Sequence, residues 1–135
     1  MRALLLAALL AALLAAPAAA QEGRVPVPEG YVEATVDLMA AQALARSCPV
    51  LAINQAVAAT RSERIVERLA AAGITSDNIV ARMADPTEAI VAGRDAFLAR
   101  TGLADGAPPE AACAAGRAEI EAGTGVGTLL VEAGG

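Results

Sequence analysis

Two cysteines are the most informative of the side chains that could carry chemistry in this chain. Cys48 and Cys113 are the only cysteines among 135 residues, and the chain contains no histidine. Thiols that bind a metal or exchange disulfides usually lie in closely spaced pairs, and metal sites often add histidine. Because this chain has neither feature, we expect a structural disulfide in preference to a catalytic or metal-binding thiol pair. We expect neither a metal nor a cofactor.

The expected disulfide would close a loop of about 65 residues between Cys48 and Cys113. In the chain-entropy description, a crosslink over such a loop stabilises the folded state by about 4 kcal/mol. Small domains have a net stability of only about 5–15 kcal/mol. We therefore expect this crosslink to supply a large share of the stability of the domain.

Carboxylates, hydroxyls, arginines and Tyr31 are the remaining candidates for catalysis, since the chain also lacks lysine and tryptophan. A hydrolase that uses paired carboxylates holds two acids in a cleft, at a set distance and with shifted pKa values. Nearly all of the 15 acidic residues lie where helix caps or solvated helix faces account for them. We therefore predict no catalytic residue and a protein that is not an enzyme.

The charge balance excludes nucleic acid as a partner. The formal net charge is −5, and Tyr31 and Phe97 are the only aromatic residues. Proteins that bind nucleic acid present a basic stripe or patch, and those that bind single strands add aromatic rings on which bases stack. This chain has neither feature, so its partner is expected to be a protein or a small molecule of unknown identity.

Three arginines could form an anion-binding helix face. Arg61, Arg64 and Arg68 are spaced i, i+3 and i+7, which places them on one side of a helix. The alternative is a solvated face on which Glu63 and Glu67 balance the arginines. Exposed helical charges of that kind are the commoner case, and the spacing alone favours the solvated face.

Residues 1–20 predict a cleaved signal peptide. Arg2 precedes an uninterrupted run of alanine and leucine over 3–16, and the small residues before Gln21 fit signal peptidase, so cleavage is expected between Ala20 and Gln21. The run has 14 residues, whereas a helix that crosses a bilayer needs about 20. We therefore expect soluble export to the periplasm, without membrane association after cleavage, rather than a retained anchor. An oxidising compartment of this kind also suits a disulfide.

The rest of the chain predicts one all-α domain, a compact bundle of about five short helices closed by the disulfide. A core of alanine, valine, leucine, isoleucine and methionine with hardly any rings suits closely packed helices better than sheets. Residues 21–28 read as an extended leader, 29–131 as a single helical domain and 132–135 as a frayed tail.

Caps and periodicity place the helices. We expect them to cover about 31–46, 49–72, 77–84, 86–101 and 109–122. Ser47 is expected to cap the second helix and Asp85 the fourth. The apolar stripe of the first helix should consist of Val32, Val36, Met39, Ala40 and Ala43, and that of the third of Ile79, Val80 and Met83.

Two features involve glycine. Gly93 lies between large apolar residues of one helix face, which indicates close approach by another helix. The glycine-rich segment 123–127 follows a helix rather than a strand and lacks the spacing of a dinucleotide-binding loop. We expect a kink or a loosened turn there instead of a phosphate site.

Several runs of the sequence resemble those of a known family. They are Cys48 itself, AGITSDNI at 72–79, GRDAFLA at 93–99, CAAGRAEI at 113–120 and VGTLL at 126–130. These runs are similar to a family of short exported alphaproteobacterial proteins, classified as domain of unknown function 5333. The resemblance covers about 38–130 and implies an exported helical domain with two cysteines, without implying an activity. The resemblance singles out six residues as candidates for a structural or functional role, namely Cys48, Gly73, Arg94, Cys113, Gly116 and Arg117.

Arg94 and Arg117 are the basic residues within these runs, and each lies beside a small residue of a helix contact. They are candidate contacts for an anion or a partner. The alternative, which we favour, is that each bonds a nearby acid or a carbonyl at the end of a helix.

Taken together, the sequence favours a non-enzymatic binding or interaction module of the periplasm. The alternative is a structural or stress-protective, chaperone-like protein. Since the chain lacks histidine, any switch driven by pH would depend on carboxylates and act near pH 4–5 or below.

Overall fold

The computed structural model describes residues 23–104 and 106–133. The predicted signal peptide, with its cleavage point after Ala20, lies outside these residues. The described residues are mostly helical, as the composition predicts, and they form six helices where about five were expected, together with two short strands. The elements are α3 (Tyr31–Ser47), β1 (Leu51–Ile53), α4 (Gln55–Ala71), α5 (Ile79–Arg82), α6 (Thr87–Thr101), α7 (Pro109–Ala122), α8 (Gly125–Thr128) and β2 (Leu130–Glu132).

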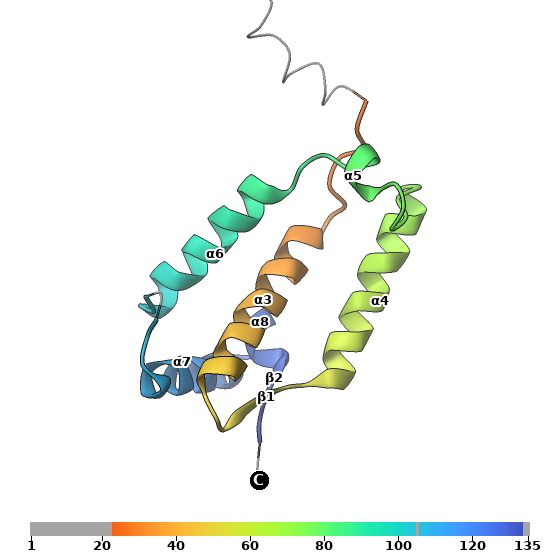
Figure 1. The fold of residues 1–135 in the computed structure, drawn as a ribbon. Coiled ribbons are helices and arrows are strands. Elements are labelled where there is room, and N and C mark those ends of the chain that lie inside the picture. The colour runs from red at the N-terminus through yellow and green to blue at the C-terminus, as the bar shows by residue number, and fades with distance from the viewer. Residues whose placement is uncertain (1–22, 105, 134–135) are drawn as a thin grey trace, which may run out of the picture.

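α3 is the central helix of the fold. It lies between α6 and α4 in Figure 1, and it also contacts α7, α8 and β1. The main core cluster takes Ala40, Ala41 and Leu44 from α3, and Phe97 of α6 and Leu129 beside β2 pack into the same cluster. None of the helices in the described part of the chain is long and apolar enough to cross a bilayer.

The buried face of α3 differs from the predicted stripe. Met39 is 47% exposed and Ala43 is also exposed, whereas Ala41 and Leu44 are buried. Alanines occur almost all round this helix, and neighbouring elements contact it on several sides. Local periodicity therefore could not determine which side faces the core. A similar error concerns α5, where Val80 is 82% exposed.

α6 ends as the sequence predicts but begins at Thr87, one residue later than expected, so that Pro86 and not Asp85 occupies the N-cap position. The Asp85 carboxylate accepts hydrogen bonds from the Thr87 backbone N–H (2.9 Å) and hydroxyl (2.6 Å), which fixes the start of the helix. These bonds to Thr87, the hydroxyl first, lower the pKa of Asp85. Gly93 allows the close approach that was expected, since a Cβ atom there would lie 2.8 Å from Val36 Cγ2 on α3.

The predicted start of the second helix is wrong. Ser47 ends α3, and Asn54 caps α4 instead, through a hydrogen bond from the Val57 N–H to its Oδ1 (3.3 Å). Between these residues, β1 pairs antiparallel with β2, with Leu51 opposite Glu132. The sequence did not predict this two-stranded sheet, because each strand has only three residues and the two strands lie far apart in the chain.

The same pairing corrects the expected frayed tail. Glu132 belongs to β2, and the Ala133 N–H donates to the Val50 carbonyl (2.8 Å). At the other end, Val25 of the expected leader forms a parallel bridge with Met83, beside α5. Both ends of the described chain are thus hydrogen-bonded to the domain.

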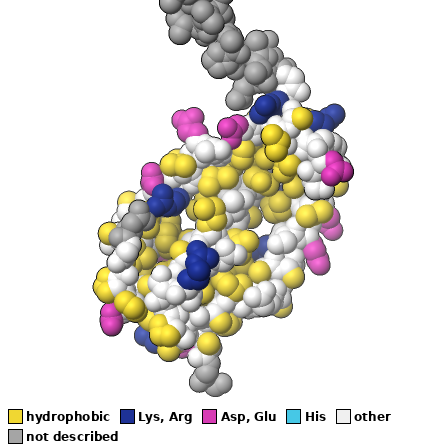
Figure 2. Space-filling model, in the orientation of Figure 1, with side chains coloured by type: hydrophobic (Ala, Val, Ile, Leu, Met, Phe, Trp, Pro, Cys, Tyr) yellow, Lys and Arg dark blue, Asp and Glu magenta, His cyan; other side chains and the backbone are white. Residues whose placement is uncertain are grey.

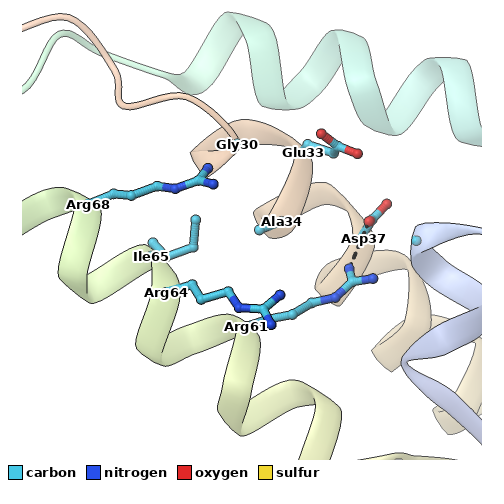
Figure 3. Close-up of a pocket in the computed structure, with 9 residues that line it drawn as sticks. Gly30, Glu33, Ala34, Asp37, Arg61, Arg64, Ile65 and Arg68 are labelled. Atoms are coloured by element: carbon cyan, nitrogen blue, oxygen red, sulfur yellow. Dashed lines mark hydrogen bonds and ion pairs between the residues drawn. The ribbon is translucent and has the colours of Figure 1, made fainter.

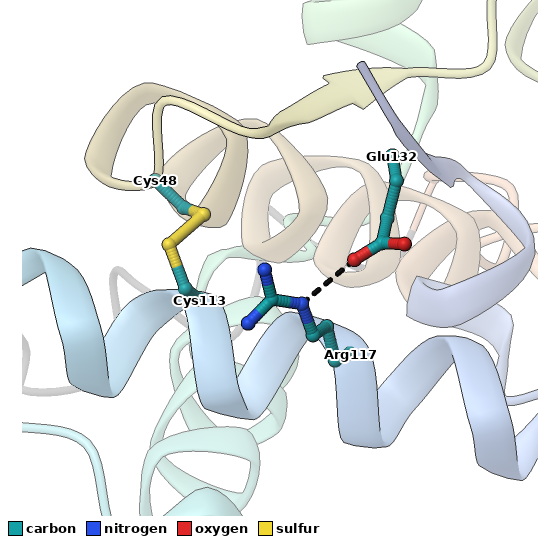
Figure 4. The surroundings of a disulfide bond; sticks show 4 residues. All are labelled: Cys48, Cys113, Arg117 and Glu132. Atoms are coloured by element: carbon teal, nitrogen blue, oxygen red, sulfur yellow. Dashed lines mark hydrogen bonds and ion pairs between the residues drawn. A yellow bond between two sulfur atoms is a disulfide. The ribbon is translucent and has the colours of Figure 1, made fainter. Parts of the chain in front are cut away.

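The predicted disulfide is present between Cys48 and Cys113, whose Cα atoms lie 5.0 Å apart. Cys48 directly follows α3 and is fully buried, and Cys113 lies in α7. Figure 4 shows the bond joining the end of the central helix to α7. It therefore links the two helices that carry much of the core.

α4 lies at the edge of the fold. None of its 17 residues is buried, and among the other helices it packs mainly against α3. The chain that follows it is better anchored, since Ile74 is only 2% exposed and its N–H donates to the Leu69 carbonyl (2.8 Å). Two pockets lie between α3 and α4, one on each side of the line along which the helices touch.

Candidate functional site

The three arginines with helical spacing line one pocket. Arg61, Arg64 and Arg68 extend from α4 toward α3 around a pocket of about 280 Å³ (Figure 3). α3 contributes Glu33 and Asp37 to the opposite wall. The acids that face the arginines are thus on another helix, whereas the sequence suggested Glu63 and Glu67 of the same helix.

Arg61 connects three helices at one end of the pocket. Its Nη1 donates to Asp37 Oδ2 on α3 (3.0 Å), and its Nη2 donates to Thr128 Oγ1 on α8 (2.6 Å). The Asp37 side chain is only 17% exposed. Burial raises the pKa of Asp37, although the hydrogen bond and positive charge of Arg61 act in the opposite direction.

Arg68 is held at the other end of the pocket. Its Nη1 donates to the Glu29 backbone carbonyl (2.5 Å), just before α3 begins. Gly30 makes room for this contact, since a Cβ atom there would lie 2.5 Å from Arg68 Nη1. The backbone of Gly30 also has a φ of 77°, which glycine adopts without strain.

Arg64 lies between these two anchored arginines and has no such anchor. Among the described residues, none accepts a hydrogen bond from its guanidinium or forms an ion pair with it, and the side chain is exposed. A guanidinium carries five N–H donors in a planar fork that matches a carboxylate or a phosphate. The pocket therefore presents an available anion-binding group between two fixed cations.

The glycine-rich segment borders this pocket without cradling a phosphate. Gly125 lies against the Asp37 carboxylate, and a Cβ atom there would overlap it. The chain turns at Gly123, which ends α7 with a φ of 61°, and the rest of the segment forms a short helix rather than a loosened turn. Thr124 caps the short helix α8 by accepting a hydrogen bond from the Gly127 N–H (3.0 Å). These glycines serve close packing around Asp37 and Glu119.

Arg94 and Arg117 do not meet in any of the pockets found among the described residues. Arg117 Nε donates to Glu132 Oε1 (2.7 Å), a contact that Figure 4 shows near the disulfide. Both side chains are 56% exposed. Arg94 lines a separate groove between α3 and α6. A contact of either arginine with an anion or a partner stays a prediction.

The sequence reasoning missed Glu119, a buried acid that holds the end of α7. It is 4% exposed, and its carboxylate bonds both the Arg100 guanidinium and the Thr124 hydroxyl. Its position on the same helix face as Ala112 and Gly116, both buried, was the available signal. An acid on an apolar face usually has a bonded partner.

Comparison with known proteins adds the family but no activity. The model of a family of unknown function (DUF5333) matches residues 28–131, which include all six helices described above. No curated protein and no solved structure matches the chain. The function therefore has to be argued from the geometry of the site.

Proposed function

The chain belongs to the family of unknown function DUF5333, and we propose that it is an exported, non-enzymatic module that binds a small anion in the arginine-lined pocket. The observation that carries this proposal is Arg64, which has no bonding partner among the described residues and lies between two arginines that do. The expected ligand carries a carboxylate or a phosphate group.

The charges around the pocket support a singly charged anionic group. Three arginines and two acids line it, so the wall has a formal charge of +1. Arg61 and Arg68 are already oriented by their bonds to Asp37 and Glu29. Binding therefore needs to order only the Arg64 side chain, which lowers its entropic cost.

Export is supported by two features of the chain. Disulfides persist mainly in oxidising compartments, and the bond between Cys48 and Cys113 closes the domain. The pattern of residues 1–20 is that of a cleaved signal peptide. Mass spectrometry of the secreted protein would test this part of the proposal, with a start at Gln21 as the expected result.

Calorimetric titration of the mature protein with inorganic phosphate and with acetate tests the binding site. We expect saturable binding that weakens as salt is added, because the pocket is open to solvent. Arg64→Gln should weaken it at least tenfold. Arg82→Gln, at an exposed arginine of α5 that lines none of the described pockets, is the matched control and should leave it unchanged. Equal binding by wild type and Arg64→Gln would exclude this pocket as the site.

A stress-protective role is the second candidate, and exposed apolar side chains favour it. Val66 is 62% exposed and Val80 82%. Unfolded chains expose apolar residues, to which exposed apolar side chains can bind. Suppression of client aggregation at pH 4 would support this role, whereas a chain that stays folded and monomeric at pH 3 without protecting a client would exclude it.

A further inference from the structure

A second site lies on the other side of the contact between α3 and α4. Two grooves flank α3, one of about 270 Å³ against α4 and one of about 370 Å³ against α6. They share Met39 and Gln42, and we call the two together the α3 trough. It follows α3 from Ala34 to Arg46, which at 1.5 Å per residue is a length of about 18 Å.

The α3 trough adjoins the arginine-lined pocket and shares Ala34, Arg61 and Ile65 with it, but the rest of its lining is different. α3 turns Glu33 and Asp37 toward the pocket, and Leu38 and Met39 toward the trough. Arg61 is one of the residues at the seam between the two helices and borders both sites. The two sites can therefore be changed independently through Arg64 on one side and Met39 on the other.

The lining of the α3 trough is apolar and contains no acid. Figure 2, drawn in the orientation of Figure 1, shows hydrophobic side chains over the face formed by α6, α3 and α4, with most acidic groups around its edge. The charged side chains that line the trough are all arginines, although the chain as a whole has a net charge of −5. The apolar lining residues include Leu38, Met39, Ile65, Val66, Phe97 and Leu98, and the arginines are Arg46, Arg61 and Arg94.

Arg46 is placed to meet a negative group at one end of the trough. It lies in the last turn of α3, it is exposed, and no hydrogen bond or ion pair joins it to another described residue. Arg94 lines the same groove from α6. The site thus combines a long apolar lining with the Arg46 guanidinium at its end.

We propose that the α3 trough binds an acyl chain with an anionic head, the chain lying along α3 and the head at Arg46. The apolar lining and the length of about 18 Å suit an extended acyl chain. The absence of acids from the lining favours an anionic head over a cationic or neutral one. The head is a carboxylate or a phosphate, as in a fatty acid or a lysophospholipid.

Fluorescence-displacement titration of the mature protein tests this proposal, with amphiphiles kept below their micelle concentrations. Sodium decanoate, dodecanoate and tetradecanoate should bind about fourfold more tightly for each added methylene, until the chain exceeds the trough. Dodecyl phosphate should also bind, and dodecyltrimethylammonium should bind at least tenfold more weakly than dodecanoate. Tighter binding of the carboxylate or of the phosphate supports the proposal and shows which of the two head groups the site prefers.

Three variants locate the site. Met39→Glu, which puts an acid on the trough floor, should abolish binding of dodecanoate, and Arg46→Gln should weaken it at least fivefold without changing the affinity for neutral dodecyl maltoside. Arg64→Gln should have no effect, which separates this site from the pocket of the proposed function. An unchanged circular dichroism spectrum checks folding, and Met39→Gln provides a milder second variant. Equal binding of anionic and cationic amphiphiles, no saturable binding, or self-association that Met39→Glu abolishes would overturn the proposal.

Discussion

Arg61 stabilises a carboxylate that burial penalises. The guanidinium bonds Asp37 on α3 and Thr128 on α8, so it holds α4 against the rest of the fold. Burial raises the pKa of Asp37, which means that the folded chain holds this proton more tightly than the unfolded chain does. Above that pKa, the ionised Asp37 therefore reduces stability, and Arg61 offsets part of the loss.

We expect Arg61→Gln to lower the free energy of unfolding by about 1–3 kcal/mol at pH 7, because it leaves the largely buried Asp37 carboxylate without the hydrogen bond from Arg61. As the pH falls through the Asp37 pKa, the carboxyl becomes neutral and the difference from wild type should shrink. Urea denaturation at several pH values measures both effects.

Asp37→Asn is the matched control, because it removes the buried charge together with the attraction. Asp37→Asn should lower the free energy of unfolding by less than Arg61→Gln does, and its effect should depend less on pH. If both variants showed the same loss at every pH, the ion pair would not be the cause.

At the scale of elements, glycines determine how closely α7 approaches its neighbours. A Cβ atom at Gly127 of α8 would overlap the backbone carbonyl of Glu119 in α7, and one at Gly116 would overlap the end of the Leu51 side chain in β1. A side chain can rotate, whereas the backbone of a packed helix cannot. The two glycines therefore differ in how well the fold can tolerate a methyl group.

We expect Gly127→Ala to lower the free energy of unfolding by about 1–3 kcal/mol, in the range of overpacked cores, and Gly116→Ala to cost less. Gly23→Ala serves as the control, since nothing lies within 4 Å of a Cβ atom there. Thermal unfolding measures the order of the three. A more damaging Gly116→Ala would mean that Leu51 is held as firmly as the backbone.

At the scale of the whole molecule, the disulfide links distant parts of the core. Cys48 and Cys113 are 65 residues apart in sequence, and they join the central helix to α7. We expect the Cys48→Ala/Cys113→Ala double variant to lose about 4 kcal/mol in guanidinium denaturation, mainly because its unfolded chain is less constrained. Reduction of the wild type should give a similar loss. An unchanged free energy of unfolding would show that packing alone holds α3 to α7.

The helical class, the disulfide, and the positions of α6 and α7 were predictable from the amino-acid sequence alone. These features follow from local chemistry. The hydrogen bonds from Thr87 to Asp85, the proline at the start of α7 and the glycines after both helices act within one turn of the residues concerned. The spacing of Arg61, Arg64 and Arg68 is equally local, so their shared helix face was predictable.

How these helices and strands pack together depends on contacts between residues far apart in the chain. β1, a strand of three residues that follows α3, pairs with β2, a strand of three residues about 80 positions later. Strands this short show no hydrophobic alternation in the sequence. The buried side of α3 depended on which neighbours pack against it, because alanine makes most of its faces alike. The ion pair of Arg61 with Asp37 on α3 also depends on how two helices pack together. It could therefore not be predicted from the residues around Arg61.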